Sequence, residues 1–261
     1  MKSSEHELLL PPVEEENICL PLSINAVSKY WNVDLPLSEA IEIAKKYPNV
    51  NGSILIEGIE LAERHGLGSS ILHSSISELK KIIDMGIPPI VILPGLHDII
   101  QHASVISGYD DGEKTIIHYI PQQHKEDQFQ IGVIPEKKFD SLWEEDGRLM
   151  IILAPLDILS EIKIGDKKLD KSNRLCFVSE RLNIQRKSDE AIQSLKKAIE
   201  IDNKNSTAFA LLGGILNEQN SPECIKYYEK SIAINDRCYL AYRGLGNYYL
   251  KNKQYDKAEQ Y

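Results

Sequence analysis

Apolar residues recur with helical spacing directly after Cys19. They stand four, three and four positions apart, so they form one face of an α-helix. The residues of this face are Leu20, Ile24, Val27 and Trp31. Pro21 falls in the first turn, where its missing N–H costs nothing. The pattern therefore predicts a helix that begins at Cys19.

Three further helices are predicted in the first third of the chain. Residues 38–47 form the first of them, and residues 54–65 form the second. Residues 75–78 read Ser-Ile-Ser-Glu, which is a capping box. This box opens the third helix, which stops at Gly86.

After these helices the pattern changes to short β-rich runs. The runs cover residues 90–93, 103–109, 115–119 and 149–153. Residues 110–113, Asp-Asp-Gly-Glu, form a turn between two of them, which predicts an antiparallel hairpin. Helices followed by a sheet are typical of the α+β class, so we predict an α+β fold for residues 1–157.

The C-terminal part, residues 171–261, has no strand pattern and repeats itself. Ala208, Phe209, Leu212 and Gly213 recur 33 positions later as Ala241, Tyr242, Leu245 and Gly246. The small residues Ala191 and Ala198 recur in the same way as Cys224 and Ser231. A period of about 34 residues, with small residues where paired helices approach, resembles the tetratricopeptide repeat.

We therefore predict an all-α solenoid of about 2.5 tetratricopeptide repeats. A charged connector, residues 158–170, joins it to the first domain. Such repeats stack into a groove that binds a protein or peptide, although a purely structural stack is the alternative. The third repeat stops at Tyr261 within its second helix, so we expect either a longer natural array or packing of this end on another chain.

Composition and charge exclude several classes of function. The formal net charge is −9 with a pI near 5.4, which argues against nucleic acid as a partner. The most apolar segment, residues 82–100, is interrupted by glycines and prolines, so no membrane span is predicted. The N-terminus lacks the apolar core of a signal peptide, so a cytoplasmic protein is expected. The four cysteines show no CxxC spacing, and we expect neither a metal nor a cofactor.

Cys19 is the candidate catalytic nucleophile of the chain. At a helix N-terminus the free backbone N–H groups and the helix dipole favour a thiolate, which is the nucleophilic form of cysteine. The alternative is a small buried apolar residue. All seven histidines lie between positions 6 and 124, so a catalytic base is expected in the first domain.

Several pieces of the first domain occur in the order known from one peptidase family. They are a Pro-rich entry at residues 10–14, Cys19-Leu20-Pro21, Asn51-Gly52-Ser53, a helix-to-strand step at residues 79–92, a strand that opens with Gln101-His102-Ala103, and closing segments at residues 134–143 and 150–155. In these pieces residues 9–156 resemble the papain-like cysteine peptidases that process bacteriocins and double-glycine leader peptides.

The resemblance implies a role for each matching residue. Cys19 attacks a peptide carbonyl, while His102 takes the thiol proton and later gives it to the leaving amine. His97 and His118 are the reserve candidates for the base, and a structural role is favoured for His118 because its neighbours in the strand are apolar.

Three positions depart from the family pattern. Glu14 replaces the glutamine that donates to the oxyanion, and Asn17 is the alternative donor. Leu20 replaces the glycine after the nucleophile, where a side chain would narrow the approach to the thiol. Ile120 replaces the aspartate that orients the histidine. The substitutes considered for that aspartate are Gln122, Gln123 and Asp98.

The retained residues and the three departures leave two possible functions. The first is a thiol-dependent peptide hydrolase whose repeat domain recruits a protein or peptide. The second is a catalytically impaired, peptidase-like scaffold that binds proteins. Retention of Cys19 and His102 favours the hydrolase, whereas the three departures favour the scaffold. The sequence does not identify the substrate.

Overall fold

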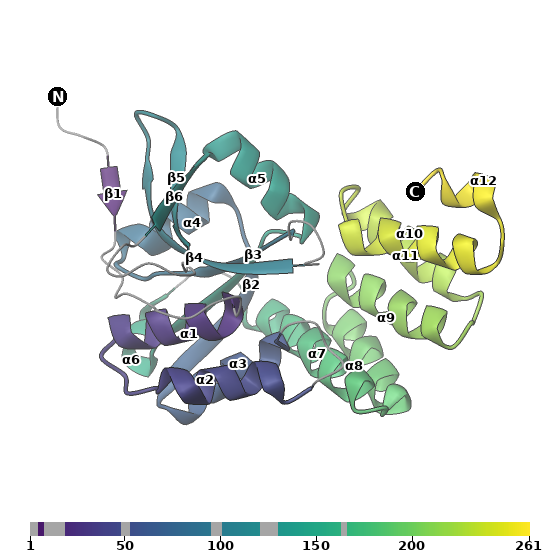
Figure 1. Ribbon diagram of the computed structural model, residues 1–261, viewed down its shortest axis with the longest axis horizontal. Helices are drawn as coiled ribbons and strands as arrows, with labels where there is room; N and C mark the ends of the chain where they lie inside the picture. Colours follow the sequence, from purple (N-terminus) through teal and green to yellow (C-terminus); the bar gives the residue numbers. More distant parts are fainter. Residues whose placement is uncertain (1–4, 8–18, 48–52, 95–100, 121–129, 163–165) are drawn as a thin grey trace. The chain divides into compact units, whose positions relative to one another are not determined.

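The computed structural model describes residues 5–7, 19–47, 53–94, 101–120, 130–162 and 166–261 (Figure 1). The chain divides into two compact units. The first comprises Met1–Trp143 and Arg148–Gly165, and the second comprises Glu144–Gly147 and Asp166–Tyr261.

The first unit is built on a seven-stranded sheet in which every described pair of strands is antiparallel. The strands are β1 (Glu5–Glu7), β2 (Leu67–His73), β3 (Ile90–Pro94), β4 (Gln101–Asp110), β5 (Thr115–Ile120), β6 (Gln130–Pro135) and β7 (Leu149–Pro155). Their order is β2-β7-β3-β4-β5-β6, and β1 pairs with β4. The predicted hairpin between β4 and β5 is confirmed.

Helices cover both faces of this sheet, so the first unit is an α+β fold (Figure 1). One face carries α1 (Cys19–Tyr30), α2 (Leu37–Lys45) and α3 (Leu55–Arg64). The other face carries α4 (Ile76–Asp84) and α5 (Glu136–Glu145). The short helix α6 (Leu156–Glu161) follows the last strand.

Local signals explain where the predicted helices begin and end. Ser75 caps α4 by accepting a hydrogen bond from the backbone N–H of Glu78, as the capping box predicts. Gly66 follows α3 and Gly86 follows α4, both with positive φ, a conformation that glycine adopts without strain.

The predicted order of helices followed by a sheet needs one correction. Strand β2 lies between α3 and α4, and it pairs along its whole length with the last strand, β7. Its sequence, Leu-Gly-Ser-Ser-Ile-Leu-His, hides the strand because a glycine and two serines interrupt the apolar alternation. The distant partner β7 satisfies its backbone groups instead.

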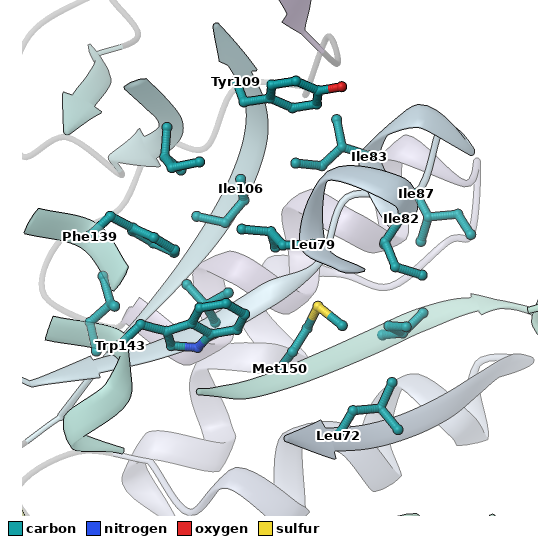
Figure 2. Packing of buried hydrophobic residues seen from close by; sticks show 14 of the residues in the cluster. Leu72, Leu79, Ile82, Ile83, Ile87, Ile106, Tyr109, Phe139, Trp143 and Met150 are labelled. Carbon is teal, nitrogen blue, oxygen red and sulfur yellow. The ribbon is translucent and has the colours of Figure 1, made fainter. Parts of the chain in front are cut away.

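A large apolar core fills the space between the sheet and the helices α4 and α5 (Figure 2). Leu79 and Ile82 of α4 meet Phe139 and Trp143 of α5 over the sheet residue Ile106, and all five are fully buried. Burying a side chain of this size stabilises a fold by about 1.5–3 kcal/mol. This core holds β3 and β4 in place.

The second unit is entirely helical in its described residues. Its helices are α7 (Lys167–Ile184), α8 (Ser188–Ile201), α9 (Ser206–Glu218), α10 (Cys224–Ile234), α11 (Tyr239–Lys251) and α12 (Tyr255–Ala258). Of the predicted connector, residues 158–161 belong to α6 and residues 167–170 belong to α7. Helix α7 begins early because the Asp166 side chain accepts a hydrogen bond from the N–H of Lys168.

The repeated small residues lie where the helices of this unit pack. Ala191 and Ala198 of α8 are fully buried, and so are their counterparts Cys224 and Ser231 of α10. The Ser231 hydroxyl donates a hydrogen bond to the carbonyl of Ser206 at 2.8 Å. Larger side chains at these positions would separate the helices.

Candidate active site

Cys19 is the first residue of α1, as its sequence pattern predicts. Its side chain is half-buried, whereas Cys176, Cys224 and Cys238 are buried. The first N–H groups of a helix have no partner within the helix, so they can donate hydrogen bonds to a group bound beside this residue. Cys19 is therefore the most accessible of the four thiols, and it lies at the N-terminus of a helix.

Leu20 does not obstruct this thiol. Its side chain is 4% exposed and packs against α3, where Gly58 leaves room for it. A Cβ atom at Gly58 would stand 3.3 Å from Cδ2 of Leu20. The departure from the family's glycine at this position thus places a side chain in the core between two helices.

The first turn of α1 lies at the start of β4. Ser23 donates a hydrogen bond to the carbonyl of Ala103 at 3.4 Å. Ser23 follows Cys19 by four positions, and residues four apart share one face of a helix. His102 immediately precedes Ala103 and is the second residue of β4. The structure therefore brings Cys19 and His102 to the same end of the sheet.

The register of the sheet fixes the face on which the His102 imidazole lies. His102 pairs with Leu93 of β3, and Leu93 belongs to the core under α4 and α5. Helix α1 packs on the opposite face (Figure 1). The thiol and the imidazole can therefore approach each other only at the end of the sheet where β4 begins. Within the described residues no hydrogen bond joins the Cys19 thiol to His102.

Burial lowers the pKa of His102 below its ordinary value. A low pKa keeps the imidazole neutral near pH 7. Only the neutral ring has the lone pair that can take a proton from a thiol. The protonation state of His102 is thus the one that a general base requires.

His118 and Ser104 form a second polar contact on this sheet. The Ser104 hydroxyl lies 3.0 Å from Nδ1 of His118, and Ser104 is fully buried. His118 is among the histidines predicted from the sequence, whereas Ser104 is not. A polar residue at a core position was the sequence signal for Ser104, because Ser104 interrupts the apolar residues of β4 on the side that faces the core.

The other predicted site residues are only partly described. Ile120 is the last residue of β5, where it pairs with Gln130 in the ladder. Glu14, Asn17, His97, Asp98, Gln122 and Gln123 lie outside the described residues. The described part of the chain contains no group of three His, Cys, Asp or Glu side chains that could hold a metal ion.

No protein-family model matches the chain, and a comparison with curated proteins finds no match. Solved structures do show a likeness. One is a double glycine motif protease from an AMS/PCAT transporter in complex with the leader peptide. It is 18% identical with a TM-score of 0.42, and the match covers 57% of this chain and 94% of that one.

Two further structures are peptidase domains of ComA. The domain of Streptococcus ComA, a bi-functional ABC transporter of a quorum-sensing pathway, is 22% identical with a TM-score of 0.45, covering 57% of this chain and 98% of that one. The domain of Streptococcus mutans ComA is 20% identical with a TM-score of 0.38, covering 56% and 98%. The chain is similar to double-glycine peptidase domains. No helix among the described residues has both the length and the apolar character needed to cross a bilayer.

Proposed function

We propose that the first unit is a thiol-dependent peptide hydrolase with Cys19 as its nucleophile and His102 as its general base. The observation that carries the proposal is the position of Cys19. This thiol is half-buried at the first residue of α1, and Ser23 of the same helix face binds the backbone next to His102. This position supports a site that combines a nucleophile at a helix N-terminus with a neutral imidazole at the same end of the sheet.

The reaction follows from these groups. His102 takes the thiol proton, and the thiolate adds to the carbonyl carbon of the peptide bond. The tetrahedral intermediate collapses when the protonated imidazole gives its proton to the departing amine, which leaves a thioester on Cys19. Water, deprotonated by the same imidazole, then hydrolyses the thioester and restores the thiol.

The rate of this reaction is expected to be low. The backbone N–H of Cys19 remains as an oxyanion donor, but Glu14 cannot donate a hydrogen bond while it is ionised. Loss of one oxyanion donor lowers kcat by about 10²- to 10³-fold. The substrate class proposed from the sequence resemblance is a peptide with a double-glycine cleavage site.

Alkylation tests the nucleophile without a known substrate. Cys19 should react with iodoacetamide at pH 7 faster than the three buried cysteines, and His102→Gln should slow the labelling of Cys19 several-fold. The labelled residue is identified by mass spectrometry of peptides. Wild type, His102→Gln and Cys19→Ala are then assayed with a fluorogenic peptide that ends in Gly-Gly. Cys19→Ala should abolish hydrolysis of this peptide. Equal labelling of Cys19 in wild type and His102→Gln, without hydrolysis, contradicts the proposal.

A second candidate function is supported by a separate observation. No hydrogen bond joins Cys19 to His102 among the described residues, and Ile120 stands where the family has its orienting aspartate. In this case the first unit is a peptidase-like scaffold, and the second unit binds a protein or peptide as a tetratricopeptide array. The burial of equivalent small residues in α8 and α10 supports this assignment of the second unit.

Deletion separates the two functions. In the scaffold, binding of a partner captured by the full chain survives Cys19→Ala and is lost when residues 166–261 are removed. In the hydrolase, Cys19→Ala removes turnover of the Gly-Gly peptide whether or not a partner is bound.

A further inference from the structure

Strand β6 forms one edge of the sheet in the first unit. Among the described residues it pairs with β5 on one side and with no strand on the other. Ile131 is 48% exposed and Val133 is 59% exposed, although isoleucine and valine are among the residues that proteins most often bury. An edge strand with exposed apolar side chains is a template for pairing with another strand.

The hydrogen bonds of the ladder show which backbone groups of β6 point away from β5. The N–H of Glu136, directly after β6, donates to the carbonyl of Lys114, directly before β5, at 2.9 Å. In an antiparallel ladder, hydrogen-bonded pairs of residues alternate with pairs that are not bonded. Counting back from Glu136 in the register of the two strands, Gly132 binds β5, whereas its neighbours Ile131 and Val133 do not. The N–H and C=O groups of these two neighbours therefore point to the free edge.

The side chains of the same two residues lie on the face of the sheet opposite the core under α4 and α5. Ile134 packs against that core, and side chains alternate along a strand, so Ile131 and Val133 point to the other face. Natural edge strands usually carry charged residues that prevent pairing. Residues 130–135 read Gln-Ile-Gly-Val-Ile-Pro, which contains no charge and only a terminal proline. The edge is thus open to a further strand.

We propose that the free edge of β6 pairs with β6 of a second copy of this chain, in antiparallel orientation about a two-fold axis beside Gly132. In this register Ile131 of each copy lies opposite Val133 of the other. Each of these two pairs exchanges two N–H···O=C hydrogen bonds, so all the outward backbone groups of both residues are satisfied. Each exposed isoleucine side chain also lies beside an exposed valine side chain.

The alternative symmetric register is less favourable. If Val133 lay opposite itself, Ile131 would lie opposite Pro135, which has no N–H to donate. The register centred on Gly132 avoids this loss. It is also isologous, because the same residues are used by both copies, and such an interface closes as a dimer.

The charges on either side of β6 favour a second copy as its partner. In the sequence the acidic residues Glu126 and Asp127 precede this strand, and the basic residues Lys137 and Lys138 follow it. Both lysines are exposed. In an antiparallel pair the segment before one strand is beside the segment after the other, so opposite charges meet at both ends. A parallel pair would bring like charges together.

The proposed interface is small, so we expect a weak dimer. The ladder involves the six residues of β6 in each copy, whereas an interface of standard size has about 20–30 residues a side. A dissociation constant in the micromolar to millimolar range is therefore expected.

Sedimentation equilibrium of the full chain over this range of concentrations tests dimerisation. The mass should rise with concentration from 29.5 kDa toward twice that value. Val133→Pro removes an N–H that points away from β5, so the strand itself is kept. It should raise the dissociation constant about tenfold or more, because the dimer loses two hydrogen bonds and each is worth up to about tenfold in affinity.

Three further variants make this test specific. Val133→Thr keeps the N–H and the β-branched shape, so it should dimerise nearly as well as wild type. Met85→Lys removes an exposed apolar side chain outside β6 and should leave the dissociation constant unchanged. Ile131→Lys places a charge on the edge and should prevent dimerisation, which keeps the test decisive if Val133→Pro does not fold.

Hydrogen exchange followed by NMR locates the interface. In the monomer the amides of Ile131 and Val133 point to solvent and should exchange fast, whereas the amide of Gly132 is bound to β5 and should be protected. Raising the protein concentration should slow the exchange of Ile131 and Val133 and leave that of Gly132 unchanged.

The outcomes decide between the second copy and other occupants of this edge. A chain that stays monomeric at millimolar concentration overturns the proposal, and so does a dimer in which the amides of Ile131 and Val133 remain unprotected. Protection of these amides in a monomeric chain by an added peptide of alternating threonine and valine would assign the edge to a foreign strand instead. None of these measurements requires turnover, so they are independent of the proposed hydrolase function.

Discussion

The buried Tyr228 ring of α10 leaves no room for a side chain at the positions that it contacts on neighbouring helices. This ring is 3% exposed and lies against Gly213 of α9 and Gly244 of α11. A Cβ atom on Gly213 would stand 2.8 Å from Cδ1 of the ring, and a Cβ atom on Gly244 would overlap it. Close approach to this buried ring therefore explains Gly213 and Gly244. Gly246, the counterpart of Gly213 in the repeat, lies near Ala258 and Tyr261 instead.

Replacing Gly244 should destabilise the second unit. Gly244→Ala forces the Tyr228 ring to move, and overpacking of this kind costs about 1–3 kcal/mol. Gly214→Ala is the matched control, because its Cβ atom would meet only the Tyr228 hydroxyl at 3.9 Å. Alanine in a helix is favoured over glycine by about 0.8–1 kcal/mol, so Gly214→Ala should not destabilise. Urea unfolding followed by circular dichroism measures both, and equal effects would refute the steric explanation.

Lys80 shows how one side chain connects three elements of the first unit. It projects from α4, forms ion pairs of 2.6 Å with Asp111 and with Glu136, and lies 4.9 Å from the centre of the Tyr109 ring. Asp111 follows β4 in the hairpin turn, and Glu136 begins α5. Its side chain is only 16% exposed, so solvent screens these contacts incompletely.

Removing this charge should loosen the packing of α4. We expect Lys80→Met to lower the free energy of unfolding by about 1–3 kcal/mol, between the values of exposed and buried ion pairs. Lys114→Met is the control, because Lys114 is 68% exposed and lies 3.6 Å from the same carboxylate. Its effect should be about 0–0.5 kcal/mol. Comparable losses for the two variants would show that burial does not decide the strength of these pairs.

The ion pair between Lys80 and Asp111 predicts that the stability of the first unit depends on pH. The hydrogen bond from Lys80 lowers the pKa of Asp111 below its usual value. The contribution of the Lys80–Asp111 ion pair to the free energy of unfolding is therefore complete above the pKa that the Asp111 carboxyl has in the unfolded chain. It is lost as pH falls through the lower pKa that this carboxyl has in the folded state. The stability difference between wild type and Lys80→Met should shrink in acid, and urea unfolding at a series of pH values measures it.

The elements that local pattern predicted are those whose partners are close in sequence. The helix at Cys19, the capping box at Ser75 and the hairpin between β4 and β5 all depend on neighbouring residues. Strand β2 was missed because its partner β7 lies some 80 positions away. At the site, Cys19 and His102 were found as single residues, but Ser104 was not, since its role arises from a neighbouring strand.

At the scale of the whole molecule, the chain has separate apolar cores. One lies between the sheet and the helices α4 and α5 of the first unit. Two smaller clusters hold the second unit together, one around Ala191 and Leu195 and one around Tyr228 and Leu245. Since each unit buries its own apolar residues, each is expected to unfold as its own cooperative transition.

Two optical probes can follow these transitions separately. Trp31 and Trp143, which are all the tryptophans of the chain, belong to the first unit. Tryptophan fluorescence therefore reports the first unit, while far-ultraviolet circular dichroism reports the helices of both units. Gly244→Ala should lower the urea midpoint of the transition that circular dichroism assigns to the second unit. The midpoint followed by tryptophan fluorescence should stay unchanged. A shift of both midpoints by the same amount would show that the units unfold together.

Local sequence patterns were sufficient to predict three features of this protein: the helix that begins at Cys19, the β4–β5 hairpin and the recurrence of small residues in the second unit. These depend on spacing, capping and turn residues within a few positions of one another. Three other features are seen only in the folded chain: β2 pairs with β7, Leu20 is buried against α3, and His102, Ser104 and His118 share one face of the sheet. Those outcomes depend on strand register and on packing between distant segments, which no local pattern encodes.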